Sequence, residues 1–201
     1  ETTFQNRLWP EKHQMAGEPI TLRDYQIEIV NKFLNTPHCL QEIATGAGKT
    51  LITAALSERV EQYGRSIVIV PNKDLVRQTA DDYANLGLDV GVYFGDKKQI
   101  GHTHTICTWQ SLNSIRKRFR DGLDELSLHE FTENVTCVIV DEVHQAKADV
   151  LKDLLTKEFA HIPLRWGLTG TIPKADHEKV SLQACLGEVT NRLSASELQD
   201  M

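Results

Sequence analysis

The chain has 201 residues, of which 40% are hydrophobic and 25% are charged, a composition that suits one globular α/β domain better than two. Its net charge of −6 argues against a protein that coats DNA non-specifically, although a local basic patch could still contact nucleic acid. No apolar run approaches the ~20 residues of a membrane helix, and the polar N-terminus does not resemble a signal peptide. We therefore expect a cytoplasmic protein with no membrane partner.

Helical spacing and β-branched runs alternate along the chain. Residues 1–19 are polar and aperiodic, which predicts a linker or the edge of a preceding domain. The first half then predicts a helix over Leu22–Leu34 with Thr21 as its N-cap, a strand over Cys39–Ile43, a helix over Lys49–Tyr63, a strand over Ser66–Val70 and a helix over Asp74–Leu86. The second half predicts strands over Val90–Phe94, Thr105–Thr108 and Val135–Val140, a helix over Ala148–Phe159 and a strand over Arg165–Leu168. The charged residues 113–134 carry no clear pattern.

This alternation predicts a mostly parallel sheet with helices on both faces. Four scattered cysteines, with no CxxC pair, are expected to be reduced and mostly buried: Cys39, Cys107, Cys137 and Cys185.

A glycine-rich segment, Ala44-Thr45-Gly46-Ala47-Gly48-Lys49-Thr50, lies between the first predicted strand and its helix. Backbone N–H groups of such a loop, at the positive end of a helix, form a site for phosphate groups. We expect Thr45, Gly46, Ala47 and Gly48 to surround the phosphates, Lys49 to neutralise them and the Thr50 hydroxyl to ligate Mg²⁺. Ile43 stands where the generic pattern has its first glycine, so the match in sequence is incomplete.

Two adjacent carboxylates, Asp141 and Glu142, follow the apolar run Val138–Val140. Ligands of open α/β sheets bind beyond the carboxyl ends of the strands, where these side chains are expected to lie. Asp141 is a candidate Mg²⁺ ligand, and Glu142 is a candidate base for the attacking water. Together with Lys49, they predict a site that cleaves a nucleoside triphosphate with the help of Mg²⁺.

These motifs, in this order, resemble the first RecA-like domain of a superfamily 2 DExH-box helicase. The segment Leu22-Arg23-Asp24-Tyr25-Gln26 is similar to the adenine-recognition element of phage UvsW-type branched-DNA helicases, XPB-like helicases and restriction-enzyme motor subunits. These families also relax the first glycine of the phosphate loop. The resemblance implies that the RecA-like, P-loop domain occupies residues 20–185 and that 186–201 begin a connection to a second RecA-like domain.

The resemblance also implies roles for shorter segments. Gln26 would read the adenine edge, beside Leu22, Arg23 and Tyr25. Two segments would contact the nucleic-acid backbone, Pro71-Asn72-Lys73 and Thr108-Trp109-Gln110, and a third would couple hydrolysis to movement, Thr169-Gly170-Thr171 with His144. The partner would be DNA, with RNA left open. Since nothing after Thr171 resembles the second domain that supplies arginine fingers, we expect this chain alone to bind ATP weakly and hydrolyse it poorly.

Three functions remain open at this point. The first is a DNA helicase or translocase, the second an ATP-dependent clamp or sensor that does not unwind nucleic acid, and the third a small-molecule kinase built on the same loop. A zinc protease is excluded, because the pattern begun by His129-Glu130 has Glu133 where the second histidine belongs. His102 and His104 are predicted to be solvated loop residues rather than metal ligands. The basic cluster Arg116-Lys117-Arg118 with Arg120 is either a solvated helix face or a contact for DNA phosphates.

Overall fold

An eight-stranded sheet forms the centre of the computed structural model, which describes residues 12–15, 18–43, 48–143, 148–170 and 189–193. The strand order is β10-β3-β9-β8-β4-β7-β5-β6, and all neighbours are parallel except β5 and the short edge strand β6. The strands are β3 (His38–Ile43), β4 (Arg65–Val70), β5 (Val90–Phe94), β6 (Lys97–Lys98), β7 (His104–Thr108), β8 (Val135–Val140), β9 (Leu164–Thr169) and β10 (Val189–Leu193). A separate ribbon pairs β1 (Lys12–Met15) with β2 (Glu18–Thr21).

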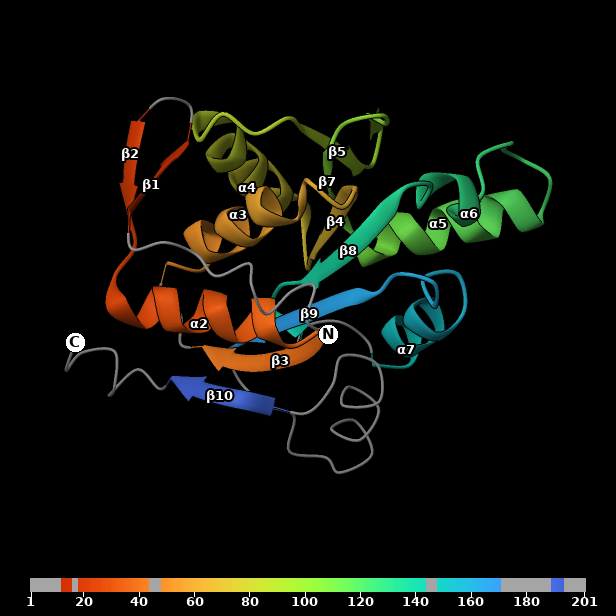
Figure 1. The fold of residues 1–201 in the computed structure, drawn as a ribbon. Coiled ribbons are helices and arrows are strands. Elements are labelled where there is room, and N and C mark those ends of the chain that lie inside the picture. The colour runs from red at the N-terminus through yellow and green to blue at the C-terminus, as the bar shows by residue number, and fades with distance from the viewer. Residues whose placement is uncertain (1–11, 16–17, 44–47, 144–147, 171–188, 194–201) are drawn as a thin grey trace.

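Helices cover both faces of this sheet, as the sequence predicts (Figure 1). One face packs against α2 (Asp24–Asn35), α3 (Lys49–Val60) and α4 (Lys73–Asn85). The other packs against α5 (Trp109–Arg120), α6 (Leu128–Phe131) and α7 (Ala148–Thr156). In β8, Cys137 and Ile139 join the first core while Val138 and Val140 join the second, because successive side chains of a strand point to opposite faces. The predicted fold class is thus confirmed.

Two buried polar contacts hold α2 against the sheet. The Gln41 side-chain amide donates to the Ile29 carbonyl at 3.0 Å, and the Trp166 indole N–H donates to the Thr36 carbonyl at 2.9 Å. Phe33 packs on Trp166 with ring centroids 5.8 Å apart. These contacts fix the position of the helix whose first turn carries the predicted adenine-reading residues.

Most predicted elements agree with the structure to within three residues, but the N-terminal region differs. Thr21 is the last residue of β2 and does not cap a helix, so that prediction is wrong. Arg23 is the N-cap of α2, and its backbone N–H donates to Gln26 Oε1 at 2.9 Å. A polar ribbon of four-residue strands carries too little apolar periodicity to be recognised in the sequence.

The unassigned residues 113–134 hold most of α5 and all of α6. Strands β6 and β10 were not predicted either, since one has only two residues and the other lies in a polar stretch. The buried cysteines Cys39, Cys107 and Cys137 are free thiols as expected, and burial raises the pKa of Cys107 and Cys137, whereas Cys185 lies outside the described residues. None of the described helices is long and apolar enough to cross a membrane.

Candidate functional site

Three charged side chains converge at the carboxyl edge of the sheet. Lys49 opens α3 after β3, while Asp141 and Glu142 follow β8, and β9 lies between these two strands. The Lys49 ammonium forms an ion pair with the Glu142 carboxylate and lies 3.5 Å from Asp141 Oδ1. All three side chains are 13–16% exposed, so a ligand could still reach them.

Backbone hydrogen bonds fix Asp141 and its carboxylate. The Asp141 N–H donates to the Ile69 carbonyl of β4 at 2.9 Å, which continues the β8–β4 ladder beyond its last paired residues. The Glu142 N–H in turn donates to Asp141 Oδ1 at 2.9 Å. Glu142 has a φ of +53°, a left-handed conformation that costs a non-glycine residue about 1–3 kcal/mol and is enriched at functional sites.

Gln26 lies against the last glycine of the predicted phosphate loop. A Cβ atom on Gly48 would come within 2.4 Å of Gln26 Nε2, and the φ of +74° at Gly48 also favours glycine. Arg23 is exposed, whereas Leu22 and Tyr25 are buried in the core behind this site. Thr45, Gly46 and Ala47, predicted to surround the phosphates, lie outside the described residues.

The two predicted nucleic-acid segments begin side by side, because β4 and β7 are neighbours and Val70 pairs with Thr108. Asn72 and Thr108 cap the helices that follow, accepting hydrogen bonds from the backbone N–H groups of Leu75 (2.9 Å) and Ser111 (3.2 Å). The remaining residues of the two segments are Pro71 and Trp109, which are partly buried, and Lys73 and Gln110, which are exposed.

The predicted coupling segment starts at the end of β9, which lies between β3, before Lys49, and β8, before Asp141 and Glu142. Thr169, the last residue of β9, is fully buried and pairs in register with Glu42 of β3. Gly170 follows it and is partly buried. Thr171 and His144 lie outside the described residues, so their predicted contact across the cleft stays a prediction.

The donor set at this edge fits a magnesium–nucleotide ligand. Asp141 offers a carboxylate, an oxygen ligand of the kind that Mg²⁺ prefers. Thr50, the second residue of α3, is partly buried and lines a groove with Asp82 and Asn85, so its predicted role as a Mg²⁺ ligand stays a prediction. Lys49 offers a single positive charge at the start of a helix, the arrangement that suits phosphate groups. The Lys49 ammonium offsets only one of the two negative charges of Asp141 and Glu142, which leaves this acidic pair able to attract a further cation.

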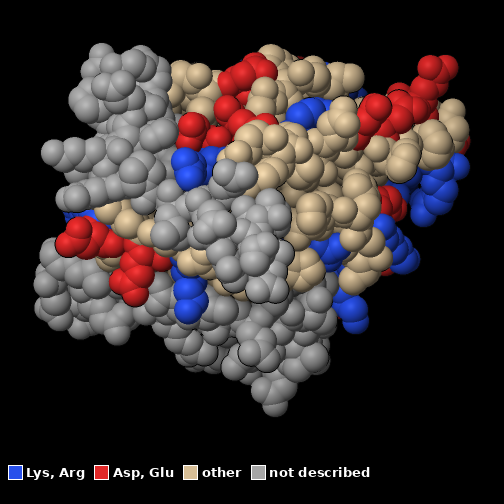
Figure 2. All heavy atoms as spheres, in the orientation of Figure 1, with Lys and Arg blue, Asp and Glu red and all other residues tan. Residues whose placement is uncertain are grey.

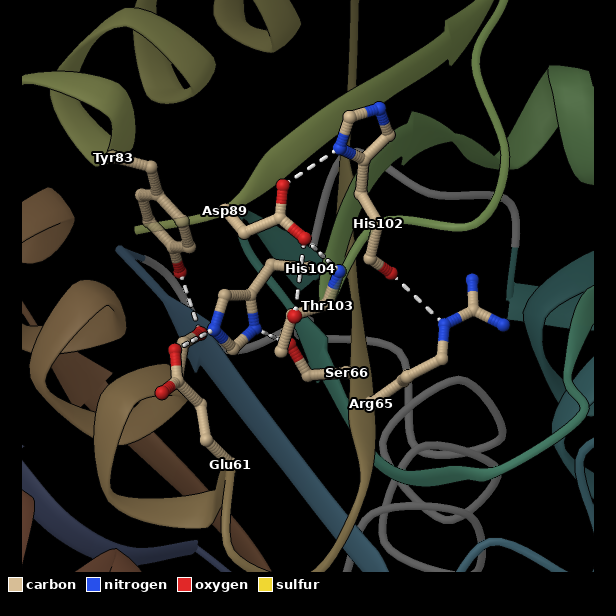
Figure 3. Close-up of polar contacts among 9 residues, drawn as sticks. Glu61, Arg65, Ser66, Tyr83, Asp89, His102, Thr103 and His104 are labelled. Atoms are coloured by element: carbon tan, nitrogen blue, oxygen red, sulfur yellow. Dashed lines mark hydrogen bonds and ion pairs between the residues drawn. The ribbon is translucent and has the colours of Figure 1, made fainter. Parts of the chain in front are cut away.

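The prediction that His104 is a solvated loop residue is wrong. His104 opens β7 and is fully buried, with Nδ1 2.6 Å from the Ser66 hydroxyl and Nε2 2.7 Å from Glu61 Oε1 (Figure 3). His102 is a partly exposed loop residue whose Nδ1 lies 2.8 Å from Asp89 Oδ1. Hydrogen bonds from His102 and Thr103 hold the pKa of Asp89 below its usual value. Among the described residues, no group of three or more His, Cys, Asp or Glu could hold a metal ion.

Three members of the basic cluster, Lys117, Arg118 and Arg120, are exposed, as expected of a solvated helix face, whereas a contact with DNA phosphates stays a prediction. Arg116 bridges α5 and the α7 region through Asp153 at 2.6 Å and Glu158 at 2.8 Å. Arg118 and Arg120 pair with nearby acidic residues, Asp124 at 2.5 Å and Asp121 at 3.4 Å. Lys117 is exposed and makes no ion pair within the described part of the chain. In sequence, Asp153 and Glu158 lie too far from Arg116 for this bridge to be anticipated.

A family model described as "Type III restriction enzyme, res subunit" matches residues 19–174. The chain belongs to this family. It is a superfamily 2 helicase-like domain with a RecA-like fold, which confirms the resemblance stated from the sequence. The 201 residues thus hold a motor-type domain of this superfamily.

Named relatives agree with this assignment. The "DNA 3'-5' helicase XPB" of Kineococcus radiotolerans is 28% identical over 180 residues, which cover 86% of this chain and 30% of the relative. The "DNA 3'-5' translocase XPB2" of Sulfurisphaera tokodaii is 28% identical over 186 residues, covering 92% of this chain and 38% of the relative. The chain thus spans about a third of the length of these curated relatives. In fold, it resembles the UvsW helicase of bacteriophage T4, with a TM-score of 0.72 at 19% identity, covering 94% of this chain and 67% of that one.

Proposed function

We propose that this chain is the ATP-binding half of a motor that couples ATP hydrolysis to movement on DNA or to its remodelling. The observation that carries the proposal is the convergence of Lys49 with Asp141 and Glu142 at the carboxyl edge of the sheet. The segments Pro71–Lys73 and Thr108–Gln110 lie at the ends of neighbouring strands at the same edge. Nucleotide chemistry and nucleic-acid contact can therefore share one rigid support.

Each residue of the cluster has a distinct part in this proposal. Lys49 leaves its ion pair with Glu142 and neutralises the terminal phosphates of the nucleotide. Asp141 and the Thr50 hydroxyl would hold Mg²⁺, and the ion would supply positive charge that offsets the charge on the phosphates. Glu142, released from Lys49, orients the attacking water and accepts its proton.

Gln26 reads the nucleotide base in this proposal. Its amide nitrogen already lies against Gly48, at the end of the phosphate loop, so a base bound beside α2 would sit close to it. The amide oxygen accepts the Arg23 N–H at 2.9 Å, which fixes the orientation of the side chain. A fixed amide distinguishes the N6 amino group and N7 of adenine from the O6 and N7 of guanine, and a buried mismatch costs about 1–3 kcal/mol.

The deciding experiment separates binding from hydrolysis. The chain carrying Glu142→Gln should still bind Mg·ATP, because the change removes the carboxylate that pairs with Lys49 and leaves the ammonium available to the phosphates. In the complete protein that carries this domain, the same change should lower DNA-stimulated hydrolysis by about 10²–10⁴-fold, the range of a positioned general base. Asp141→Asn is the matched variant, and it should weaken Mg²⁺-dependent binding itself. Equal hydrolysis by Glu142→Gln and the unmodified protein would overturn the proposal.

A further inference from the structure

A groove of about 330 Å³ lies between the β5–β6 hairpin and the exposed face of α5. Its volume is at the lower end of the range for ligand sites. Its wall includes the aromatic ring of Tyr93 and the polar or charged side chains of Lys98, Gln110, Ser114, Arg118 and Asp124. The groove is therefore separate from the Lys49 cluster, yet it shares Gln110 with the second predicted nucleic-acid segment.

The hairpin side of the groove is held firmly. Gly95, with a φ of +52°, opens the two-residue turn between Phe94 and Lys97. Beyond the turn, the Gln99 N–H donates to the Val92 carbonyl at 3.0 Å, and the Val92 N–H donates to Gln99 Oε1 at 3.0 Å. Since Lys98 pairs directly with Tyr93, both side chains lie on the groove side of the hairpin, whereas Lys97 does not line the groove.

The helix side presents a polar stripe. Gln110, Ser114 and Arg118 are spaced four residues apart, so they follow one another along one face of α5. The stripe begins inside the segment Thr108–Gln110 and extends it by two helical turns away from the sheet. Amide, hydroxyl, lysine and arginine groups are the side chains that contact phosphate and sugar in nucleic-acid complexes.

Two positive side chains, Lys98 and Arg118, line the groove and could bind an anion, but the Asp124 carboxylate pairs with Arg118. Arg118 Nε lies 2.5 Å from Asp124 Oδ2, and the backbone N–H of Leu123 donates to the Arg118 carbonyl at 2.8 Å, closing the turn that carries Asp124. This pair holds the guanidinium at the groove while cancelling its charge, and Lys98 lies on the opposite wall. On the face drawn in Figure 2, acidic and basic side chains likewise lie in small separate groups rather than in one basic surface.

We infer that this groove binds a backbone phosphate of the nucleic-acid strand beyond the contacts of Gln110, with Lys98 and Ser114 on opposite sides of the phosphate. The inference rests on the proposed function, because the strand must already follow Pro71–Lys73 and Thr108–Gln110 to reach the groove. Asp124 limits the affinity, so binding at this position stays weak enough for a moving strand to leave.

The test measures the affinity of the full chain for a fluorescein-labelled single-stranded oligonucleotide by anisotropy, at several KCl concentrations. Lys98→Ala should weaken binding about three- to tenfold and lower the salt slope by about one phosphate contact. Lys97→Ala is the matched control, with the same charge change one residue away, and should have a much smaller effect. Asp124→Asn should act in the opposite direction and tighten binding about threefold, because Arg118 is no longer neutralised.

The outcomes separate this inference from the proposed function. Failure of the unmodified chain to bind the oligonucleotide would overturn both the nucleic-acid partner and the groove. Normal binding, with equal effects of Lys98→Ala and Lys97→Ala, would overturn the groove alone and leave the lysines as protection of an exposed sheet edge. Thermal melting of each variant verifies that the hairpin and α5 remain folded.

Discussion

Replacing Lys49 by alanine tests the charge balance of the cluster directly. In the folded chain one ammonium meets two carboxylates, and all three side chains are 13–16% exposed. Removing the ammonium leaves Asp141 and Glu142 facing each other with no cation between them. We therefore expect Lys49→Ala to destabilise the ligand-free protein as well as to abolish its nucleotide chemistry.

The size of the effect follows from the geometry. At 3.5 Å and an effective dielectric of ~20, the attraction between Lys49 and Asp141 is about 5 kcal/mol before desolvation is subtracted. Exposed pairs retain about 0.2–1 kcal/mol of such an attraction, and removal of one partner from a buried pair costs about 3–5 kcal/mol. The partial exposure of these side chains places the expected loss near 2 kcal/mol. For a chain of this length, that corresponds to a drop in Tm of about 4–8 °C.

Urea and thermal unfolding, with and without Mg²⁺, provide the assay. Lys117→Ala is the control, since Lys117 is exposed and has no ion pair among the described residues. Mg²⁺ should restore part of the stability lost in Lys49→Ala. It should affect the unmodified chain less, because there the Lys49 ammonium already lies beside Asp141 and Glu142. In the double variant Lys49→Ala/Glu142→Gln, most of the loss should disappear. A stability of Lys49→Ala equal to that of Lys117→Ala would show that the ion pair contributes nothing and would refute this reasoning.

Two further changes test other parts of the structure. Gly48→Ala should lower the free energy of unfolding by about 1–2 kcal/mol, because φ is +74° and the new Cβ would meet Gln26 Nε2. In urea unfolding, the double variant Gly48→Ala/Gln26→Ala should recover only the part of this loss that is due to that contact. Full recovery would contradict the contribution of the backbone conformation. His104→Leu should cost about 2 kcal/mol, because it leaves the buried Ser66 hydroxyl without its ring partner. Glu61→Gln should change stability little, because Glu61 can turn to solvent; equal losses in the two variants would place the stabilisation in the contact between His104 and Glu61 instead.

The sequence predicts the frame of this domain well because its signals are local. Apolar periodicity and β-branched runs locate strands β3, β4, β5, β7, β8 and β9 and helices α2, α3, α4 and α7. The order of the motifs, with the rule that ligands bind at the carboxyl ends of strands, also places Lys49 and Asp141 at one edge before any coordinates are known. Their proximity in the structure agrees with that expectation.

What the sequence misses depends on contacts between distant residues. His104 reads as a loop residue until Ser66 is placed opposite it across the β4–β7 ladder and Glu61 reaches its other ring nitrogen. Arg116 reads as part of a basic surface until α7 brings Asp153 and Glu158 beside it. The groove at Lys98 requires a hairpin with a two-residue strand, which is too short to produce a periodic signal. Each of these features depends on sheet order or helix packing, which composition and spacing do not encode.

The strand order also bears on how the two halves of the site could communicate. Asp141 donates its N–H to the Ile69 carbonyl, and Ile69 is followed by Val70 and then by Pro71, where the first nucleic-acid segment begins. Val70 is in register with Thr108, the N-cap of α5. A ligand that pulls Asp141 toward a metal therefore acts on the end of a hydrogen-bonded ladder whose next strands carry both proposed nucleic-acid contacts. A packed parallel sheet resists stretching, so a shift at Asp141 is expected to move these segments as a unit rather than to be absorbed locally. Under the proposed function, we therefore expect the sheet edge to link the nucleotide site to the two nucleic-acid segments.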